Sequence, residues 1–338
     1  MIYIGVDAHQ SFSTFYGADQ ETGEIVIDQD KVPTQAQAFA KLFGGRKLQA
    51  VATVEASNIS AFVAEMLEPF VERVVIADPK VVRQLVRRSR PKTDRVDAQE
   101  LAWQLSRGLI HEVYQHRPDN LAQRALARGL ASVTQSSTRL RNQIRSLLAQ
   151  FGHKCRYSDL CGKAAREYLA TVQLPEPAQA ALAGMTAALF AVQEQREQLQ
   201  SQVKALGREH EQAQLLQSLP GIGPQTALAL VTEVGDIRRF RSYRGFINFC
   251  GLAPRVEQSG SSRRTGKLIK GNRHLKAALL QAANSLAQQW RGNTPLHRYY
   301  RDSLGRLGLN KAKLNTARKL AELVHALLHS GEPYRFAG

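Results

Sequence analysis

Five short segments in the first eighty residues have the residue pattern of β-strands. Two of them alternate between apolar and polar residues, and three are short, mostly apolar runs. The expected strands are Ile2–Asp7, Ser13–Ala18, Glu24–Lys31, Ala50–Val54 and Val71–Ile76. Helical spacing is found at Thr34–Phe43, Ala61–Leu67, Val81–Val86 and Asp94–Arg107. The residue pattern of the N-terminal part of the chain therefore predicts an α/β domain.

The order of these elements narrows the fold. Three strands followed by helix and strand in turn is the order of an RNase H-like domain, although other α/β folds share it. We expect this domain to span residues 1–115, and residues 116–217, whose pattern is almost wholly helical, to form a linker and oligomerisation region. Residues 218–338 are expected to form a mainly helical C-terminal domain. The predicted fold class is thus α/β plus all-α.

One helical stretch has an unusually regular repeat, with steps of alternately three and four residues. Its positions are Leu182, Met185, Leu189, Val192, Arg196, Leu199, Val203, Leu206 and His210. This is the a/d seam of a coiled coil. The seam predicts a coiled coil between chains, an antiparallel pair within one chain, or an amphipathic helix packed on its own domain. Arg196 is unfavourable in a dry seam unless a carboxylate or the partner accommodates it.

The segment Leu219-Pro220-Gly221-Ile222-Gly223-Pro224 separates two helical runs, Ala213–Leu219 and Gln225–Val234. Two glycines allow a tight turn, and Pro224 suits the first position of a helix. The pattern is that of a helix-hairpin-helix module, in which backbone amides at a helix N-terminus hold a phosphate. Such hairpins also serve as plain structural corners.

The charge of the chain identifies the class of partner. Lysine and arginine number 46 against 29 aspartates and glutamates, which leaves a net charge of +17. Such an excess favours a polyanion. Nucleic acid is preferred over a membrane surface, because no apolar run reaches the roughly 18 residues of a spanning helix and no signal-peptide pattern is present at the N-terminus. The three cysteines, Cys155, Cys161 and Cys250, form no CxxC pair and are interpreted as thiols of a protein in a reducing cytoplasm.

Four acidic residues in this basic sequence are candidates for a catalytic site. Asp7 ends the first strand in GVDAH, Glu55 follows the fourth strand in VEAS, and Asp94 and Asp97 open a helix in KTDRVDA. Residues three apart share one face of a helix, so that a helix placed near the ends of the two strands brings the four carboxylates together. Hard oxygen ligands suit Mg²⁺ or Mn²⁺, and a pair of such ions promotes phosphoryl transfer. The sequence therefore predicts a metal-dependent catalytic site of Asp7, Glu55, Asp94 and Asp97.

These motifs resemble the four acidic residues of the DEDD transposases of the insertion-sequence "one-ten" family (IS-one-ten and IS-eleven-eleven elements). The family's N-terminal domain is similar to that of the RuvC Holliday-junction resolvase. The resemblance continues in the second half of the chain. There Gly251-Leu252-Ala253-Pro254, Ser259-Gly260, Gly266-Lys267 and Lys270-Gly271-Asn272-Arg273 look like the family's C-terminal transposase domain. Nearly the whole chain is covered.

The resemblance implies a serine nucleophile in the C-terminal domain, which attacks DNA to give a phosphoserine link. The matching residue is Ser259. The family more often has Ser-Ser-Gly at this point, whereas this chain has Gln258 before the serine and Ser261 and Ser262 after it. Ser261 and Ser262 are therefore alternatives. From the residues alone, a serine beside a glycine in a basic loop is usually only a loop residue, and no His-Asp pair is evident to activate it.

Basic residues crowd both sets of motifs, and a third group lies between Arg291 and Lys319. We interpret these runs as tracks for phosphate groups. The residues expected to bind nucleic acid are Arg87, Arg88, Arg90, Lys92, Arg95, Gly221, Gly223, Arg255, Arg263, Arg264, Lys267, Lys270 and Arg273.

Together, the residues and the resemblance predict a DNA recombinase that excises and inserts a mobile element. The resemblance also implies a non-coding bridge RNA that pairs with double-stranded donor and target DNA, and a homo-oligomer, a dimer or a tetramer. The expected location is the prokaryotic cytoplasm, in association with the nucleoid and not with a membrane. The alternatives are a RuvC-like resolvase or nuclease that uses water, and a nucleic-acid-binding scaffold without catalysis.

Overall fold

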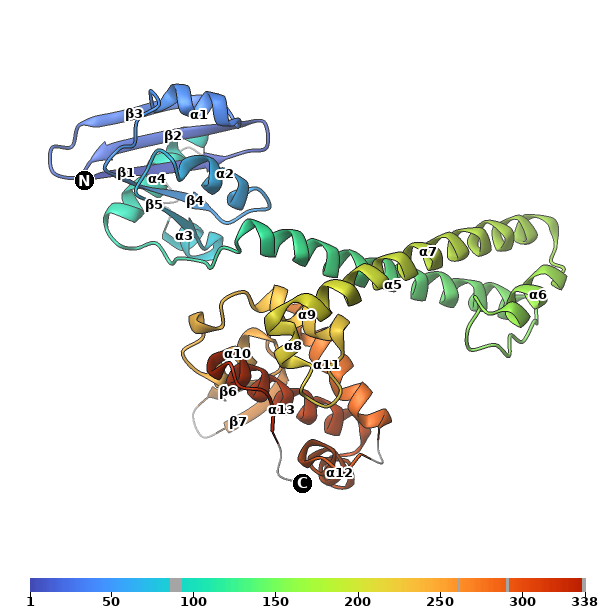
Figure 1. The fold of residues 1–338 in the computed structure, drawn as a ribbon. Coiled ribbons are helices and arrows are strands. Elements are labelled where there is room, and N and C mark those ends of the chain that lie inside the picture. Colours follow the sequence, from blue (N-terminus) through green and yellow to red (C-terminus); the bar gives the residue numbers. More distant parts are fainter. Residues whose placement is uncertain (86–92, 260–261, 290–291, 336–338) are drawn as a thin grey trace. The chain divides into compact units, whose positions relative to one another are not determined.

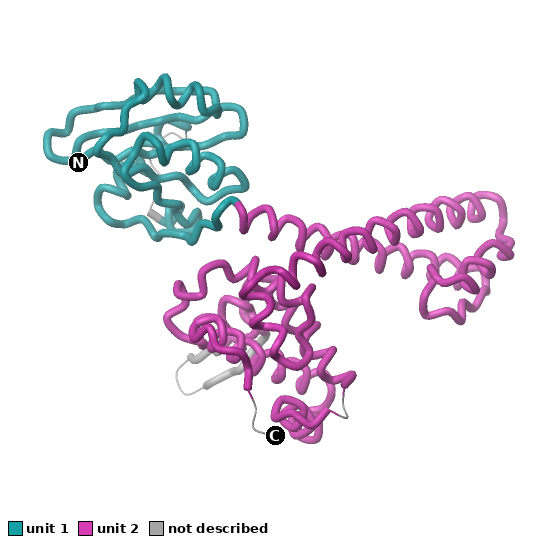
Figure 2. Tube along the Cα trace, in the orientation of Figure 1, with its two compact units in different colours: residues 1–118 teal, residues 119–338 magenta. Residues whose placement is uncertain are grey.

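The computed structural model describes residues 1–85, 93–259, 262–289 and 292–335. For residues 85, 256–259 and 262–267 it describes the backbone only. The chain divides into two compact units, residues 1–118 and residues 119–338 (Figure 2). Each unit has hydrophobic clusters of its own, and each is described separately below.

The first unit is built on a mixed five-stranded sheet (Figure 1). Its strands are β1 (Ile2–Ala8), β2 (Phe12–Asp19), β3 (Ile25–Pro33), β4 (Ala50–Glu55) and β5 (Arg73–Ala77). They lie in the order β3-β2-β1-β4-β5. The first three strands pair antiparallel, and β4 and β5 run parallel to β1. The strands occur where the sequence pattern predicts them, and their order is consistent with an RNase H-like domain.

Helices cover both faces of this sheet, and their positions also agree with the predicted ones. They are α1 (Ala36–Leu42), α2 (Ser60–Leu67), α3 (Pro79–Leu85) and α4 (Asp94–Ser106). Successive side chains of a strand point to opposite faces. Ile4 and Val6 of β1 point into a core that contains residues of α1 and α2. Gly5 lies against α4 on the other face. The face that carries Gly5 is therefore the α4 face of the sheet, and Asp7 belongs to it.

The second unit begins with a long helical hairpin. Its two arms, α5 (Pro118–Gln150) and α7 (Glu176–Glu209), are joined through α6 (Lys163–Thr171). Leu182 and Leu189 of the seam are buried in a cluster with Ile144 and Leu148 of α5. Further along α7, Val203 is buried in the second hydrophobic cluster of the unit together with Leu130 of α5. The seam of α7 thus forms an antiparallel pair within one chain, and its association with another chain stays a prediction.

The remainder of the second unit is mainly helical, as expected from its sequence. Its helices are α8 (Glu211–Leu216), α9 (Pro224–Val234), the 3₁₀ turn η1 (Ile237–Arg239), α10 (Tyr243–Phe249), α11 (Arg273–Gln288), α12 (Pro295–Leu307) and α13 (Leu309–Ser330). The basic segment that the sequence suggests as a loop instead contains a two-stranded antiparallel sheet of β6 (Pro254–Ser259) and β7 (Ser262–Leu268). None of the helices in the described ranges combines the length and the apolar character needed to cross a membrane.

A buried carboxylate joins three helices of this unit. Glu233 of α9 is 2% exposed and forms ion pairs with Arg124 and Arg128 of α5. Its Oε2 also accepts a hydrogen bond of 2.8 Å from Asn272, whose own side chain caps the start of α11. Burial alone would raise the pKa of Glu233, but hydrogen bonds from Arg128, Asn272 and Arg124 outweigh this effect and lower the pKa to about 2. Glu233 is therefore ionised and structural at neutral pH.

We expect Glu233→Gln to lower the free energy of unfolding at pH 7 by about 3–5 kcal/mol, because it leaves two arginines without their counter-charge. The pKa of Glu233 falls from 4.5 to about 2 on folding. Ionised Glu233 therefore stabilises the protein above pH 4.5, and this contribution, about 3 kcal/mol, is lost as the pH falls toward 2. Urea unfolding of both proteins from pH 7 to pH 2.5 measures the difference.

The control for this prediction is Glu322→Gln, because Glu322 forms an exposed ion pair with Lys319 at 3.0 Å. Exposed pairs contribute about 1 kcal/mol or less, so that this variant should resemble the wild type. A difference between wild type and Glu233→Gln that does not shrink at low pH would contradict the assigned pKa.

Candidate active site

The register of the central strands places two of the predicted carboxylates at one end of the sheet. β1 and β4 are parallel, and the last residues paired between them are Val6 and Val54. Asp7 and Glu55 follow these residues directly and therefore lie at the same level, on neighbouring strands. Since residues at the same level of a parallel pair point to one face, both belong to the α4 face of the sheet. The strand ends thus bring Asp7 and Glu55 to one edge, as the sequence predicts.

Helix α4 supplies the other two carboxylates, and Gly5 allows it to approach closely. A Cβ atom at Gly5 would lie 2.0 Å from the carbonyl oxygen of Ala98 and 2.5 Å from the amide nitrogen of Ala102. No other residue type leaves the space for this contact between helix and strand. At the start of the helix, the Thr93 hydroxyl accepts a hydrogen bond from the amide of Val96, which fixes the first turn. Asp94 is consequently held next to Asp7.

We expect Gly5→Ala to separate α4 from β1 and thereby disrupt the site. The added methyl group meets backbone atoms that cannot rotate away, so that the free energy of unfolding should fall by about 3 kcal/mol. The recombination activity that the resemblance implies should fall at least about a hundredfold, because small displacements of reacting groups have effects of this size. Urea unfolding and a recombination assay measure the two effects.

Gly17→Ala provides the matched control on the neighbouring strand. There the closest atom to an added Cβ is Cγ1 of the Ile4 side chain, at 3.0 Å, and a side chain can shift. This variant should keep most of its stability and activity. Equal behaviour of the two alanine variants would show that the contact of Gly5 with α4 does not hold the site together.

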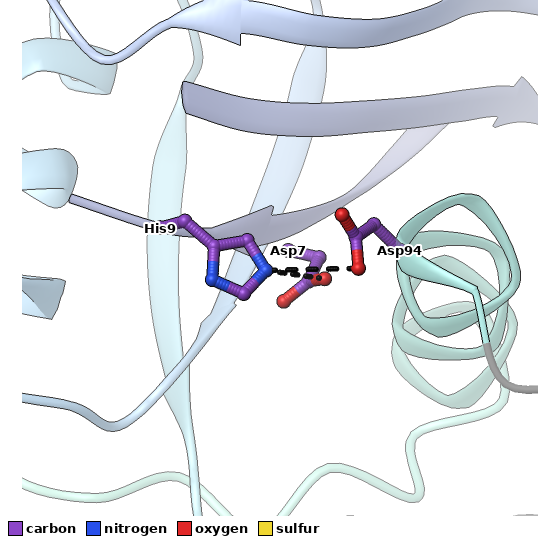
Figure 3. Close-up of side chains that lie close together, drawn as sticks. All are labelled: Asp7, His9 and Asp94. Atoms are coloured by element: carbon purple, nitrogen blue, oxygen red, sulfur yellow. Dashed lines mark ion pairs between the residues drawn. The ribbon is translucent and has the colours of Figure 1, made fainter. Parts of the chain in front are cut away.

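Three side chains converge at this position (Figure 3). The Nε2 atom of His9 lies 3.3 Å from Oδ2 of Asp7 and 3.7 Å from Oδ1 of Asp94. One ligand atom from each of the three residues lies within 4.8 Å of the others. Asp7 and His9 come from the end of β1 and the residues after it, and Asp94 comes from the first turn of α4. The structure thus joins two segments that are more than eighty residues apart in the sequence.

The electrostatics of the cluster are those of crowded carboxylates. Burial raises the pKa of Asp7, and the neighbouring charges of Asp94 and Asp97 raise it further. His9 acts in the opposite direction, but the net effect is a raised pKa. Asp97 is therefore close enough to Asp7 to raise its pKa. It is not one of the three residues whose ligand atoms converge. A cation placed among these groups would relieve their repulsion.

Glu55 lies at the same edge but makes a different contact. Its Oε1 atom lies 3.6 Å from a guanidinium nitrogen of Arg83 in α3. Both side chains are accessible, at 35% for Glu55 and 79% for Arg83. Glu55 does not belong to the converging group of Asp7, His9 and Asp94. A modest movement of an exposed arginine would free its carboxylate.

The converging donors fit a divalent cation. The carboxylate oxygens of Asp7 and Asp94 are hard ligands of the kind that Mg²⁺ and Mn²⁺ prefer, and the imidazole of His9 offers a nitrogen beside them. The raised pKa of Asp7 shows that its negative charge lacks full compensation from the protein. His9 was not selected from the sequence. The only available signal is its place two residues after Asp7, beyond the end of the same strand.

The predicted nucleophile and its basic neighbours are placed only in part. Ser259 pairs with Ser262 across the β6–β7 hairpin, but its side chain lies outside the described residues. The same holds for the side chains of Arg263, Arg264 and Lys267. Arg255, Lys270 and Arg273 are exposed on the second unit. In the first unit, Arg95 forms an ion pair with Asp28. Arg87, Arg88, Arg90 and Lys92 lie outside the described residues.

The two glycines in the turn between α8 and α9 have different surroundings. Gly221 has φ of +87°, and a Cβ atom there would lie 2.5 Å from the carbonyl oxygen of Ala282 in α11. Gly221 therefore allows the turn to pack against α11. Gly223 precedes α9 and is exposed, with no atom near the position of a Cβ. Of the two predicted phosphate-binding positions, Gly223 is the more exposed one.

Comparison with known proteins finds two matches to transposase families. Residues 4–153 match a family of DEDD transposases of the IS110 type, and residues 213–301 match the family described as "Transposase IS116/IS110/IS902 family". The first match contains Asp7, Glu55, Asp94 and Asp97, and the second contains Ser259. The two matches lie in the first and second halves of the chain, with the whole of α7 between them.

Curated relatives lead to the same family. The transposase for insertion sequence element IS1111A of Coxiella burnetii is 30% identical over 77% of this chain and 72% of its own length. A putative transposase of Sinorhizobium fredii, y4pF/y4sB, is 29% identical over 100% of this chain and 86% of its own length. A pilin gene-inverting protein of Moraxella bovis is 29% identical over 36% of this chain and 38% of its own. The chain therefore belongs to the IS116/IS110/IS902 family of transposases, enzymes that move segments of DNA.

Proposed function

We propose that this transposase excises and inserts its element by metal-assisted cleavage and rejoining of DNA strands at the end of β1. The observation that carries the proposal is the convergence of Asp7, His9 and Asp94, where Gly5 allows α4 to contact the sheet. Asp97 and Glu55 lie at the same edge and complete a set of four carboxylates. DEDD transposases typically act with a divalent metal, and this donor set is suited to Mg²⁺ or Mn²⁺.

Asp7 and Asp94 would hold the ion, together with Glu55 once its carboxylate is released from Arg83. When bound, the ion would neutralise charge that develops on the scissile phosphate. The protein's own contribution is to bring the carboxylates into one partly buried position, where strand ends and a capped helix hold them. Preorganised groups of this kind need no rearrangement at the moment of reaction.

The covalent step would use Ser259. Its Oγ would attack the phosphorus atom, forming a phosphoserine ester, while the bond from phosphorus to the leaving strand breaks and that strand takes up a proton as a free hydroxyl. A hydroxyl of the second strand would then attack the ester and release the serine. Each step exchanges one phosphoester bond for another, so that rejoining needs no external source of energy. Support comes from the resemblance around Ser259-Gly260 and from the basic residues in β7.

The choice of DNA sequence would belong to a bridge RNA that pairs with donor and target DNA. The net charge of +17 suits a protein that binds two kinds of polyanion. In RNA-guided systems, base pairing with the RNA determines which DNA sequence is bound, and the protein recognises the backbone and the shape of the helix. The RuvC-like character of residues 1–115 and the helix-hairpin-helix of α8 and α9 belong to this proposal, as does phosphate contact at Gly223.

We also propose that the enzyme works as a homo-oligomer, in which carboxylates and serine of one active site come from different subunits. Residues 116–217 would form the oligomerisation region, because their long helices expose extensive polar surface beyond the intramolecular seam. The relative from Moraxella bovis is called a pilin gene-inverting protein. Inversion of a DNA segment requires cuts and joins at two sites, and a multimer can supply both.

Reconstitution tests the proposed function. Purified protein is mixed with RNA transcribed from the flanks of the element, with donor and target DNA and with Mg²⁺, and junctions are read by sequencing. Recombinant junctions are expected only when all components are present, and sequencing of RNA that copurifies with the protein identifies the guide. Junctions formed in EDTA would overturn the metal's role, and junctions formed equally without RNA would overturn the guide. DNA that is cut but never rejoined would favour a water-using nuclease.

A further inference from the structure

A cavity in the second unit has a mixed polar and apolar lining, and none of the residues assigned to catalysis is among its lining residues. It has a volume of about 490 Å³ and is lined by α5, α7, α9 and α11, which are labelled in Figure 1. Among its lining residues are Arg128, Arg196, Gln200, Gln225, Thr226 and His274. Its rim is accessible, because Ala131 and Gln281 are exposed. A cavity of this size accommodates a group as large as a nucleotide.

Arg196 is the least expected residue of this lining. It occupies a seam position of α7, where a cation is unfavourable without a counter-charge. Its side chain is half-buried, and its Nε atom is buried without a hydrogen-bond partner in the described part of the chain. No carboxylate of the described residues forms an ion pair with it; Glu197, its neighbour in α7, accepts a hydrogen bond from Gln193 instead. Arg196 is thus a half-buried cation with no carboxylate partner among the described residues, and its charge is available to an anionic ligand.

The charges around the cavity also favour an anion. Glu233 is the single acidic residue among those that line it, and both oxygens of Glu233 are already engaged by Arg124, Arg128 and Asn272. Among the lining residues, the two guanidinium groups of Arg128 and Arg196 therefore stand against the one carboxylate of Glu233. Burial and the nearby charge of Arg128 lower the pKa of His274, so that the imidazole is neutral at pH 7 and does not add to this charge. The cavity therefore keeps a positive excess.

The remaining lining is suited to a sugar–phosphate unit. Gln200, Gln225 and Thr226 carry side-chain donors of the kind that contact phosphate and sugar in nucleic-acid complexes. Gln200 donates a hydrogen bond to Gln225 at 3.3 Å, a weak contact that a ligand can replace. Arginine binds phosphate through two parallel hydrogen bonds. We propose that this cavity binds a backbone phosphate of a nucleic-acid strand, with Arg196 as its principal ligand.

The first test uses inorganic phosphate and the full-length protein. Phosphate should raise the melting temperature at constant ionic strength, by about 5–10 °C at a hundredfold excess over its dissociation constant. Arg196→Met keeps the length of the side chain and removes its charge. This variant should melt no lower than the wild type in phosphate-free buffer, and it should lose the response to phosphate. A lower melting temperature with the response retained would show that Arg196 is structural, and would overturn the proposal.

The second test asks whether the phosphate belongs to a strand. Affinities for a DNA duplex and an RNA duplex of the same sequence are measured against salt concentration. Arg196→Met should lose one phosphate contact and thereby lower the slope of log affinity against log salt concentration by about 0.9. This change is expected for the duplex whose backbone enters the cavity. The control is Lys204→Met, which removes an exposed charge from the same helix. The proposal that the cavity binds a backbone phosphate would be overturned if the slope changed equally in Arg196→Met and Lys204→Met. It would also be overturned if Arg196→Met changed the slope for neither duplex, whatever the outcome of the reconstitution above.

Discussion

Asp7→Asn is expected to abolish recombination while the protein remains folded and at least as stable as the wild type. The amide has the shape of the carboxylate but cannot supply a negative charge to a metal ion, and losses of about a thousandfold or more are expected when such a group is removed. The stability follows from the sign of the pKa shift. Burial and the charges of Asp94 and Asp97 raise the pKa of Asp7 above its ordinary value. Ionised Asp7 therefore destabilises the metal-free fold, and the amide removes this penalty.

Recombination is measured in the reconstituted reaction with Mg²⁺, and stability by urea unfolding at pH 7 in EDTA. Asp94→Asn should also abolish recombination, because Asp94 shares the contact with His9. Asp19→Asn is the control: Asp19 lies at the opposite end of the sheet, paired in register with Ile2, and interacts with the N-terminal amine. Full activity of Asp7→Asn in Mg²⁺ would remove Asp7 from the site. A marked loss of stability in EDTA would mean that Asp7 serves the fold.

Asp7 and Glu233 differ in how far the surrounding residues compensate their negative charge. Both are partly or wholly buried, yet the pKa of Asp7 is raised and that of Glu233 falls to about 2. Glu233 is surrounded by two arginines and an asparagine amide, whereas Asp7 faces other carboxylates and one histidine. An acidic group without full compensation has a stability cost that binding of a cation can offset. Arg196 is the opposite case, because it is a cation that has no carboxylate partner among the described residues and whose charge an anion can compensate.

Much of the first unit could be predicted because its signals are local. The strands are short and their register is determined by which face is buried, so that Asp7 and Glu55 could be placed at one edge from their positions after apolar runs. Asp94 and Asp97 follow from helical spacing. The contact of Gly5 with α4 could not be predicted, because it depends on the approach of a helix from a distant part of the chain. His9 joins the cluster for the same reason.

The second unit shows where a pattern allows more than one structure. The a/d seam of α7 requires an apolar partner but does not say which one, and in the structure much of it is buried against α5 of the same chain. The segment from Pro254 to Leu268 is rich in arginine, serine and glycine, and lacks the apolar alternation that identifies a strand. It forms the β6–β7 pair all the same. Backbone pairing in a two-stranded hairpin needs no buried face, and a periodicity search therefore misses it.

Ser259→Ala should prevent formation of a covalent protein–DNA adduct while binding of RNA and DNA remains as in the wild type. A serine hydroxyl is a weak nucleophile at neutral pH, so that neutralisation of charge on the phosphate must supply much of the lowering of the barrier. The adduct is trapped with a DNA substrate nicked near the cleavage site, separated on a denaturing gel and located by peptide mass spectrometry. Recombination by Ser259→Ala should fall below detection, a loss of at least about a thousandfold.

The hairpin itself provides matched controls for this experiment. Ser262 is the residue paired with Ser259 across β6 and β7, and Ser261 directly precedes Ser262 in the sequence. Ser261→Ala and Ser262→Ala remove the same hydroxyl from adjacent positions and should keep the adduct and the activity. Transfer of the adduct to Ser261 or Ser262 in the mass spectrum would reassign the nucleophile within the hairpin. Efficient recombination by all three variants would exclude a serine ester, because rejoining would then have to proceed by direct attack of a strand's own hydroxyl.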